Sequence, residues 1–455
     1  MVRVSVVHLD LGIGGAERLV VNTSIAMKEL GHEVEIFTTH HDKTHCFEET
    51  KEGGVLADHV WVYGDWLPRQ LFKRGTAFFS VLRMLYLTLV IVLLHAFRRK
   101  RSEKEHVVFI DGVSAPIPLF KFMGLTVIFY CHFPDKLLVI SAGGPLKRAY
   151  RYLLDWLEEN STGCADLILC NSTFTAHEFR LAFRNLGATF IPSVLNPTVE
   201  NDILVEDYLE KKKVNLKSLA SSANSSSLIA YTHGADFVFL SLNRFERAKR
   251  VEFALGALKL LKDRIATNYK NKVIKVILVV AGGYDPQVLD NELYLKDLQT
   301  VARQLNIEDD VVFRTSIGKE ERFALLSASS ALVYTPSREH FGIVPIEAMA
   351  LGTPVIAVAS GGPLETINEG ATGFLCAQSP LDFANNMMRF IIDPNLSLNM
   401  AEKCRLHVER NFTGSAMKKK LEVYMRKCVE EKNNPRTKYY VRKFAFQLLR
   451  SDLHH

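Results

Sequence analysis

At 455 residues the chain is longer than a typical single domain, so we expect two domains of about 200 residues each. Hydrophobic residues make up 48% and charged residues 23%, a composition that excludes an intrinsically disordered chain. The formal net charge of +6 suits a phosphate-bearing ligand or an acidic membrane surface, and we expect no nucleic acid partner. Seven cysteines, an odd number without a Cys-x-x-Cys pair, indicate a reducing compartment rather than a disulfide framework.

The first half of the chain, which we take as a domain over residues 1–200, alternates strand-like and helix-like segments. Its opening apolar run is too short for a secretory signal peptide and leads into a glycine turn, so we expect a strand there. Strands are predicted at 2–9, 33–39, 107–110, 127–131 and 166–170, and helices at 16–30, 146–159 and 174–183. This alternation predicts a doubly wound α/β domain with a parallel sheet.

The segment 76–97 is almost wholly apolar and long enough to span a bilayer, with basic residues at 73–74 and 98–101 on either side. Arg83 near its centre would cost about 2.5 kcal/mol on insertion scales. A single crossing would also separate the glycine loop near residue 14 from everything after residue 101. We therefore favour a helix that lies in the membrane interface or dips in and back, with a core helix as the alternative.

A polar, serine-rich stretch at 201–235 reads as a linker or insertion, and a second alternating series follows at 236–415. Strands are predicted at 237–242, 273–281, 311–313, 331–335 and 354–358, and helices at 251–263, 291–305, 320–327 and 344–351. A second doubly wound domain is expected, and ligands bind such sheets at the carboxyl ends of their strands. The basic, aromatic-containing helices at 416–455 are either a surface that touches anionic lipid or a solvated terminal segment.

A glycine-rich turn separates the first predicted strand from the first predicted helix. Gly12, Gly14 and Gly15 let backbone N–H groups approach an anion at the helix N-terminus. A dinucleotide fingerprint is the competing interpretation, but Glu17 stands where its third glycine belongs. The second predicted strand also ends without a ribose-binding acid, so an NAD site is disfavoured.

In the second half, two cations stand five residues apart at a predicted strand-to-helix turn. Arg244 and Lys249 can together neutralise a diphosphate leaving group as its bond to a sugar breaks. Gly282 and Gly283 end the next predicted strand, where glycine permits close backbone approach to a ligand. A plain turn explains the two glycines equally well when they are taken alone.

Two glutamates eight residues apart form the most specific pattern in the chain. Glu339 lies in the loop after a predicted strand, and Glu347 lies within the following helix among apolar neighbours. A carboxylate buried there needs hydroxyl or cationic partners, which the hydroxyls of a ribose would supply. Gly342 lies in the turn into that helix, so free N–H groups face whatever binds there.

Taken together, these motifs resemble the large family of retaining glycosyltransferases that are built from two Rossmann-like domains, the GT-B fold of family 4. The similarity covers essentially the whole chain: Gly-Gly-Ala-Glu-Arg at 14–18, Arg-x4-Lys at 244–249 and Glu-x7-Glu at 339–347. The segments at 9–18, 130–135, 281–285 and 338–345, with the apolar segment at 76–97, are similar to eukaryotic mannosyltransferases that extend dolichol-linked oligosaccharides. These enzymes add both α-1,3-linked and α-1,6-linked mannose.

The resemblance implies a GDP-mannose donor held mainly by the second domain. Arg244 and Lys249 would hold its phosphates and Glu347 its ribose, while Glu339 and the amides at 342–344 would contact the sugar and phosphate. The implied donor site comprises Arg244, Lys249, Gly282, Gly283, Glu339, Gly342, Ile343, Val344 and Glu347. The catalytic candidates are Glu339, Lys249, Arg244 and His132.

The resemblance also implies an acceptor site in the first domain. Gly14, Gly15 and Arg18 would form a loop over the phosphates or the acceptor, and His132 at a strand end would face the transferred sugar. A packed, purely structural histidine remains the alternative for His132. The two domains would face each other across a cleft that holds both substrates.

The acceptor implied is a mannosylated chitobiose on dolichyl diphosphate at the cytosolic face of the endoplasmic reticulum membrane. Transfer would retain the anomeric configuration through a same-face displacement, without a dedicated carboxylate nucleophile. No cofactor beyond the donor and no metal are expected, since the chain has no Asp-x-Asp motif to hold one. Other mannosyltransferases of lipid-linked oligosaccharide assembly are candidate partners.

Two further hypotheses stay open at the level of sequence. One is a glycosyltransferase of the same architecture with another donor or another acceptor, such as a soluble sugar. The other is a non-catalytic membrane adaptor that has kept the fold. The presence of all four of Arg244, Lys249, Glu339 and Glu347 weighs against an adaptor.

Overall fold

The computed structural model describes residues 1–71, 75–99, 105–138, 144–200, 203, 234–430, 432 and 434–451. The predicted linker at 201–235 lies almost entirely outside the described residues, as do the basic residues at 73–74 and 100–101. The chain forms two compact units. Unit 1 consists of Met1–Thr198 and Gly414–His455, and unit 2 consists of Val199–Thr413.

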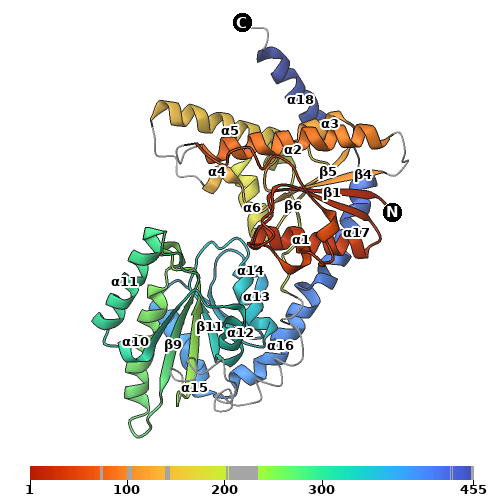
Figure 1. Ribbon diagram of the computed structural model, residues 1–455. Helices are drawn as coiled ribbons and strands as arrows, with labels where there is room; N and C mark the ends of the chain where they lie inside the picture. Colours follow the sequence, from red (N-terminus) through yellow and green to blue (C-terminus); the bar gives the residue numbers. More distant parts are fainter. Residues whose placement is uncertain are drawn as a thin grey trace. The chain divides into compact units, whose positions relative to one another are not determined.

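Unit 1 is built on a seven-stranded parallel sheet with the strand order β3-β2-β1-β4-β5-β6-β7 (Figure 1). The strands are β1 (Arg3–Asp10), β2 (Glu33–His40), β3 (Val60–Val62), β4 (His106–Asp111), β5 (Thr126–Cys131), β6 (Leu167–Cys170) and β7 (Ser193–Val194). The central strands are rich in Val, Ile and Phe and are buried on both faces, as a parallel sheet covered by helices requires.

Helices cover both faces of this sheet. They are α1 (Gly15–Glu29), α2 (Thr76–Arg99), α3 (Ile117–Phe122), α4 (Asp135–Leu138), α5 (Pro145–Gly163), α6 (Thr173–Ala182), α7 (Arg184–Thr189), α17 (Gly414–Glu430) and α18 (Pro435–Ser451). Residues of α2, α3, α6 and α18 share one hydrophobic core, whereas α1 and α17 form a separate core on the opposite face (Figure 1). Unit 1 is therefore doubly wound.

The C-terminal helices belong structurally to this unit. Met417, Leu421, Met425 and Cys428 recur at helical spacing on α17 and are buried, and α17 packs against α1. On α18 the ring of Tyr440 occupies the space above Gly163, at the end of α5, where a side chain would clash with it. The predicted terminal segment is thus two helices, each with one side packed against unit 1.

Helix α2 is apolar on two sides, but only one of them packs against the protein. The buried positions, which recur at helical spacing, are Arg83, Met84, Leu87, Thr88 and Ile91. The exposed apolar residues are Phe78, Leu82, Leu89, Leu93 and Phe97. The stretch Thr76–Phe97 is long and apolar enough to cross a bilayer, but a crossing would require its packed side to leave the sheet.

Arg83, the polar interruption of this apolar helix, is paired inside the protein. Its guanidinium makes two contacts with Asp10, at 2.6 Å from Nη2 to Oδ1 and 3.2 Å from Nη1 to Oδ2. The Arg83 side chain is only 2% exposed. Although burial opposes the effect, this cation holds the pKa of Asp10 below its ordinary value. While α2 is packed in this way, the Arg83 side chain does not enter lipid, so the free-energy cost of inserting it into a bilayer does not apply.

Unit 2 contains a six-stranded parallel sheet with the order β10-β9-β8-β11-β12-β13. Its strands are β8 (Phe237–Leu242), β9 (Val276–Gly282), β10 (Val311–Thr315), β11 (Ala331–Tyr334), β12 (Val355–Val358) and β13 (Gly373–Cys376). Its helices are α10 (Glu252–Asn268), α11 (Leu289–Gln304), α12 (Lys319–Ala328), α13 (Ile343–Ala350), α14 (Pro363–Thr366), α15 (Pro380–Ile392) and α16 (Leu396–Asn411). The predicted fold class of two doubly wound α/β domains is confirmed.

Each sheet has one point at which the order of its strands reverses. This point lies between β1 and β4 in unit 1 and between β8 and β11 in unit 2. Ligands of open parallel sheets bind beside the carboxyl ends of the strands at such a point. The loops after β1, β8 and β11 contain Gly14, Arg244, Lys249, Glu339 and Gly342 among the residues singled out in the sequence.

Candidate active site

In unit 2 the loops after β8 and β11 bring together a cation and a carboxylate that the sequence separates by 90 residues. Lys249 ends a 3-10 turn (η5, Arg247–Lys249), and its Nζ lies 2.7 Å from Oε2 of Glu339. The two side chains are 18% and 23% exposed, so the pair is half-buried and open to a ligand. Thr335 donates a hydrogen bond to the Lys249 carbonyl oxygen at 2.7 Å, which fixes the backbone of this turn.

Tyr334, the last residue of β11, lies near the Glu339 carboxylate. Burial, and then the negative charge of Glu339, raise the pKa of Tyr334 well above its ordinary value. Tyr334 is therefore a neutral phenol beside the site. No sequence pattern indicated that this tyrosine would lie there.

Arg244 lies beside the glycine pair that ends β9. A methyl group added to Gly283 would come within 3.2 Å of Cγ of Arg244. At Gly282, with φ of +149°, an added Cβ would overlap the carbonyl oxygen of Asn243, so only glycine fits. The Arg244 side chain is 69% exposed and its Nη1 contacts Glu246 at 3.0 Å, so a weak surface pair leaves it accessible to an anion.

The N-terminus of α13 is shaped by glycine at three positions. Gly342 immediately precedes Ile343 and Val344 and has φ of +83°, the left-handed conformation that glycine adopts without strain. No side chain among the described residues caps this helix, so its first N–H groups can bind an anion. The backbone of 338–341 is supported by Gly361 and Gly362, where any Cβ would overlap it. Neither of these two glycines was among the residues predicted from the sequence.

Glu347 is buried within α13, as its apolar neighbours predicted. Burial raises its pKa to about 7, against the opposing charge of Arg322. Arg322 on α12 is its cationic partner, with Nη1 at 3.3 Å from Oε1. Its other oxygen, Oε2, has no hydrogen-bond partner among the described residues. A pair of ligand hydroxyls would satisfy this atom, as the sequence analysis expected.

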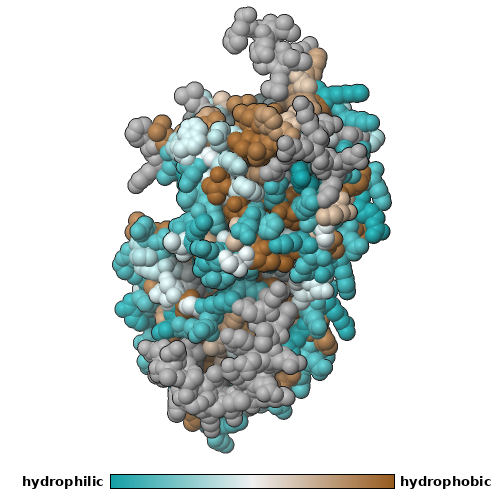
Figure 2. Space-filling view, turned by 45° about the vertical axis from the view of Figure 1, so that its right-hand side comes forward, coloured by the Kyte–Doolittle hydropathy of each residue, from teal (hydrophilic) through white to brown (hydrophobic). Residues whose placement is uncertain are grey.

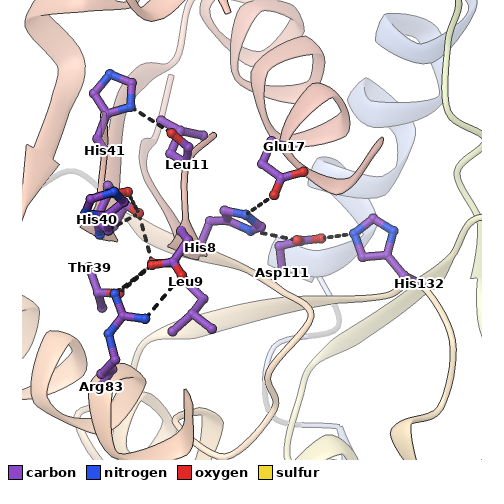
Figure 3. A network of polar contacts seen from close by, with 12 residues as sticks. His8, Leu9, Leu11, Glu17, Thr39, His40, His41, Arg83, Asp111 and His132 are labelled. Carbon is purple, nitrogen blue, oxygen red and sulfur yellow. Dashed lines mark hydrogen bonds and ion pairs between the residues drawn. The ribbon is translucent and has the colours of Figure 1, made fainter. Parts of the chain in front are cut away.

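In unit 1 the carboxyl ends of β1, β4 and β5 carry a chain of titratable residues (Figure 3). His132, directly after β5, places Nε2 at 2.7 Å from Oδ1 of Asp111, the last residue of β4. The other oxygen of Asp111 lies 2.8 Å from Nδ1 of His8 on β1. The Nε2 atom of His8 lies 4.0 Å from Oε1 of Glu17 in the first turn of α1.

The two histidines determine the charge of the carboxyl group between them. The side chain of Asp111 is 1% exposed, and burial alone would raise its pKa, but His132 and His8 hold it well below its usual range. Asp111 in turn raises the pKa of His8, although burial of that ring acts in the opposite direction. Asp111 is therefore a buried carboxylate that accepts hydrogen bonds from both rings.

The glycine loop precedes α1. Gly14 is the N-terminal cap of the helix, and the Glu17 carboxylate folds back over it. Nothing lies within 4 Å of the position of a Cβ on Gly15, so the backbone there is open. Arg18 is held by Glu49, with Nη1 at 2.6 Å from Oε1, and by the face of the Phe47 ring. A ligand would have to compete with Glu49 for this arginine.

The structure thus groups the predicted residues into several clusters. Lys249 and Glu339 are in direct contact, Arg244 lies against Gly283, and Glu347 pairs with Arg322 rather than with another predicted residue. In unit 1, His132 belongs to a network whose other members, His8 and Asp111, the sequence analysis missed. The available signal was that both stand near predicted strand ends, since β1, β4 and β5 are neighbours in the sheet.

Comparison with protein families gives the class of the molecule. Residues 13–188 match the family model described as Glycosyltransferase Family 4, and residues 232–407 match Glycosyl transferases group 1. A sucrose-phosphate synthase from Thermosynechococcus elongatus has the same fold, with a TM-score of 0.64 and 18% identity over 94% of this chain and 100% of that chain. The chain has the fold of the two-domain GT-B glycosyltransferases.

Closer relatives narrow this class. The alpha-1,3/1,6-mannosyltransferase ALG2 of Mus musculus is 39% identical over 93% of this chain and 95% of its own length. ALG2 of Saccharomyces cerevisiae is 36% identical over 96% of this chain and 86% of its own length. The chain belongs to the ALG2 family of alpha-1,3/1,6-mannosyltransferases, as its motifs predicted.

Proposed function

We propose that this chain transfers mannose from GDP-mannose to a mannosylated chitobiose on dolichyl diphosphate, forming α-1,3 and α-1,6 linkages with retention of configuration. The cluster at the carboxyl ends of β8, β9 and β11 carries the proposal, because it offers cations, helix-start amides and carboxylates where a nucleotide-sugar would bind. Membership of the alpha-1,3/1,6-mannosyltransferase family supports mannose as the transferred sugar.

The contact between Lys249 and Glu339 suggests how the donor engages unit 2. A diphosphate is a stronger anionic partner for Lys249 than one carboxylate, so donor binding replaces Glu339 at the ammonium group. The released Glu339 can then accept hydrogen bonds from hydroxyls of the mannose. Arg244 adds a second positive charge, and the unpartnered oxygen of Glu347 accepts from the ribose.

The chemistry then requires stabilisation of a departing diphosphate. As the bond between the sugar C1 and the β-phosphate oxygen breaks, negative charge develops on that oxygen, and Lys249, Arg244 and the first amides of α13 neutralise it. The acceptor hydroxyl attacks C1 from the same face, and its proton passes to the leaving phosphate. The anomeric configuration is retained without a carboxylate nucleophile, and the cationic side chains perform the neutralisation for which other enzymes use a metal ion.

A lipid-linked acceptor requires the enzyme to work at a membrane surface. The outward side of α2 supplies an apolar face, because Leu89, Leu93 and Phe97 are 55%, 50% and 76% exposed. Figure 2 shows exposed hydrophobic residues on the part of unit 1 from which α18 projects. A helix packed on one side and apolar on the other lies flat in the interface, with its axis parallel to the membrane.

Helix α18 adds the charged part of this surface. Its outward side carries Pro435, Lys438, Tyr439, Arg442, Lys443 and Phe446, which recur at helical spacing. Basic side chains next to aromatic rings suit a surface of anionic phospholipid headgroups. We place this surface on the cytosolic face of the endoplasmic reticulum membrane, where other enzymes of lipid-linked oligosaccharide assembly would be neighbours.

The test is a transfer assay with purified protein. The protein is incubated with GDP-mannose, or with UDP-glucose in parallel, and a short-lipid diphosphate trisaccharide acceptor, and the products are weighed by mass spectrometry. We expect products that have gained one and then two hexoses from GDP-mannose only. Consumption of UDP-glucose with GDP-mannose ignored would overturn the donor assignment. Purified wild-type protein that yields no product from either donor would support the adaptor hypothesis instead. A Glu339→Gln variant that extends the glycan at the wild-type rate would contradict the role given to Glu339.

A further inference from the structure

His132 has a fixed orientation that depends on two residues further inside unit 1. Its Nε2 atom lies 2.7 Å from Asp111, whose second oxygen lies 2.8 Å from Nδ1 of His8. The side chains of Asp111 and His8 are 1% and 9% exposed, whereas that of His132 is 28% exposed (Figure 3). His132 is thus the accessible end of a relay that starts in the core.

We propose that His8 is a positioning residue for the glycosyl transfer, acting through the Asp111 carboxylate to hold His132 neutral, with Nδ1 as a hydrogen-bond acceptor for a substrate hydroxyl. This role rests on the proposed function and on the expectation from the family resemblance that His132 faces the transferred sugar. His8 itself would not touch either substrate. Its effect is on which nitrogens of the His132 ring carry a proton.

Hydrogen-bond chemistry assigns the protons. An ionised carboxylate only accepts, so both His132 Nε2 and His8 Nδ1 must carry the protons that they share with Asp111. A neutral His132 then has its lone pair on Nδ1, the ring nitrogen that does not face Asp111. A protonated His132 would carry hydrogen on both nitrogens and could no longer accept a hydrogen bond there.

The charges around the relay decide which form prevails. Burial opposes a proton on the His8 ring, but Asp111 and Glu17 favour one and raise the pKa of His8 above its ordinary value. The positive charge of that proton balances Asp111, and His132 also packs against the uncharged ring of Tyr130, with ring centroids 4.8 Å apart. Without a positive charge at His8, the Asp111 carboxylate would favour a proton on His132 instead.

The test compares two variants whose effects have opposite signs. His8→Asn keeps an amide donor near the place of Nδ1 but removes the charge, so the acid limb of the pH profile of kcat/KM should move up by about one pH unit. Asp111→Asn removes the negative charge from the centre of the relay, so the acid limb should move down, and kcat should fall because His132 loses its orientation. The shift, rather than the loss of activity, distinguishes this role from a packing role.

His106→Asn is the matched control. His106 is another buried histidine of the same sheet, on β4 with Asp111, but its Nε2 contacts Ser5 at 2.8 Å and it begins the strand that Asp111 ends. Its pH profile should coincide with that of the wild type. Thermal unfolding of each variant verifies that it is folded. A His8→Asn profile that coincides with the wild type, or limbs that move in the same direction in both variants, would overturn the proposal.

A spectroscopic measurement on the wild type covers the case in which a variant does not fold. Selective ¹⁵N-histidine labelling should show His132 as the Nε2–H tautomer and His8 as an imidazolium near neutral pH. A Nδ1–H tautomer at His132, or a neutral His8, would contradict the assignment. If the wild type transfers no mannose at all, the proposed function fails, whereas the relay is judged by these tautomers alone.

Discussion

Lys249 is fixed at both of its ends, through its ammonium group by Glu339 and through its carbonyl oxygen by Thr335. Two constraints on one short turn place a cation accurately, at the strand end where a diphosphate is expected. Such an arrangement matters for catalysis more than for stability, because a half-exposed ion pair contributes only about 0–1 kcal/mol to folding.

We therefore predict that Lys249→Met lowers kcat/KM for GDP-mannose by about 10²–10³-fold, the loss typical of one preorganised charge-stabilising group. The melting temperature should change little. Lys259→Met is the control, since Lys259 forms an exposed ion pair with Asp263 on α10 and has no part in the site. Steady-state kinetics measure kcat/KM for GDP-mannose in both variants. An equal loss of kcat/KM in the two variants would contradict the role given to Lys249.

The buried carboxyl group of Glu347 makes a prediction about pH. Burial raises its pKa to about 7, so the folded protein binds its proton more tightly than the unfolded chain does. Stability contributed by this group is present at low pH and is lost as the pH rises towards 7. The ionised form, which accepts from two ribose hydroxyls, prevails above that pH.

GDP should accordingly bind more tightly as the pH rises through about 7. Isothermal titration between pH 5.5 and 8.5 measures this dependence. In Glu347→Gln, whose amide does not titrate, the affinity should be weaker and flatter across the same range. An unchanged slope in the variant would show that another group is responsible.

Prediction from the sequence succeeded at residues whose signal is local. Glu347 is an example, because its apolar neighbours indicated burial and thus a need for partners. It failed for His8 and Asp111, which are 103 residues apart in the chain. Their contact depends on β1 and β4 being neighbours in the sheet, and no local pattern encodes that adjacency.

At the scale of elements, α2 has two apolar sides with different fates. One packs on the sheet around the Arg83–Asp10 pair, and the other remains exposed. The helix therefore resembles a membrane span in composition, because residues on both sides are apolar. One side is apolar because it packs in the protein core, whereas the other is apolar and exposed. The sequence could not separate the two sides, since the packed one includes an arginine whose partner lies 73 residues away.

We predict that Leu89→Gln with Leu93→Gln lowers binding to anionic lipid vesicles by about tenfold or more, because burying each leucine in lipid is worth about 1.5–3 kcal/mol. The melting temperature should not fall, since both side chains are exposed. Ile392→Gln, at a residue of unit 2 that is 66% exposed, is the control. Vesicle co-sedimentation measures the effect, and unchanged binding would exclude α2 as the contact.

Most of the elements that were predicted with bounds lie within a few residues of their expected positions, whereas the shortest strands were missed. Strands β3 and β7 have three and two residues, too few for a periodic pattern to appear. The strand expected at 273–281 begins later, at Val276, because Val273 is 94% exposed and lies before the sheet. Hydrophobicity alone did not mark that boundary.

On the scale of the whole molecule, unit 1 is discontinuous. Its sheet and most of its helices come from Met1–Thr198, but α17 and α18 come from the far end of the chain. The alternating pattern predicted two doubly wound domains, yet it could not predict which of them the final helices would join. The buried residues Met417, Leu421 and Met425 make that choice, because α17 packs against α1. Met417, for example, contacts Thr23, which lies 394 residues earlier.

We predict that deletion of residues 414–455 leaves unit 1 unable to fold, because it exposes the apolar side of α1 and the core positions next to Tyr440 and Phe444. Limited proteolysis should then degrade unit 1 while a fragment covering unit 2 persists. Deletion of residues 452–455 alone should have no effect on expression or protease resistance. A stable, soluble protein lacking 414–455 would contradict this dependence.

The return of the polypeptide to its first half has a consequence for biosynthesis. A ribosome delivers all of Val199–Thr413 before it delivers α17, so the later-made unit can close its core while the earlier-made one still waits for its covering helices. Until α17 has been synthesised, the apolar side of α1 is exposed and must be protected from aggregation. A nonsense mutation late in the message would then be as damaging as one near its start.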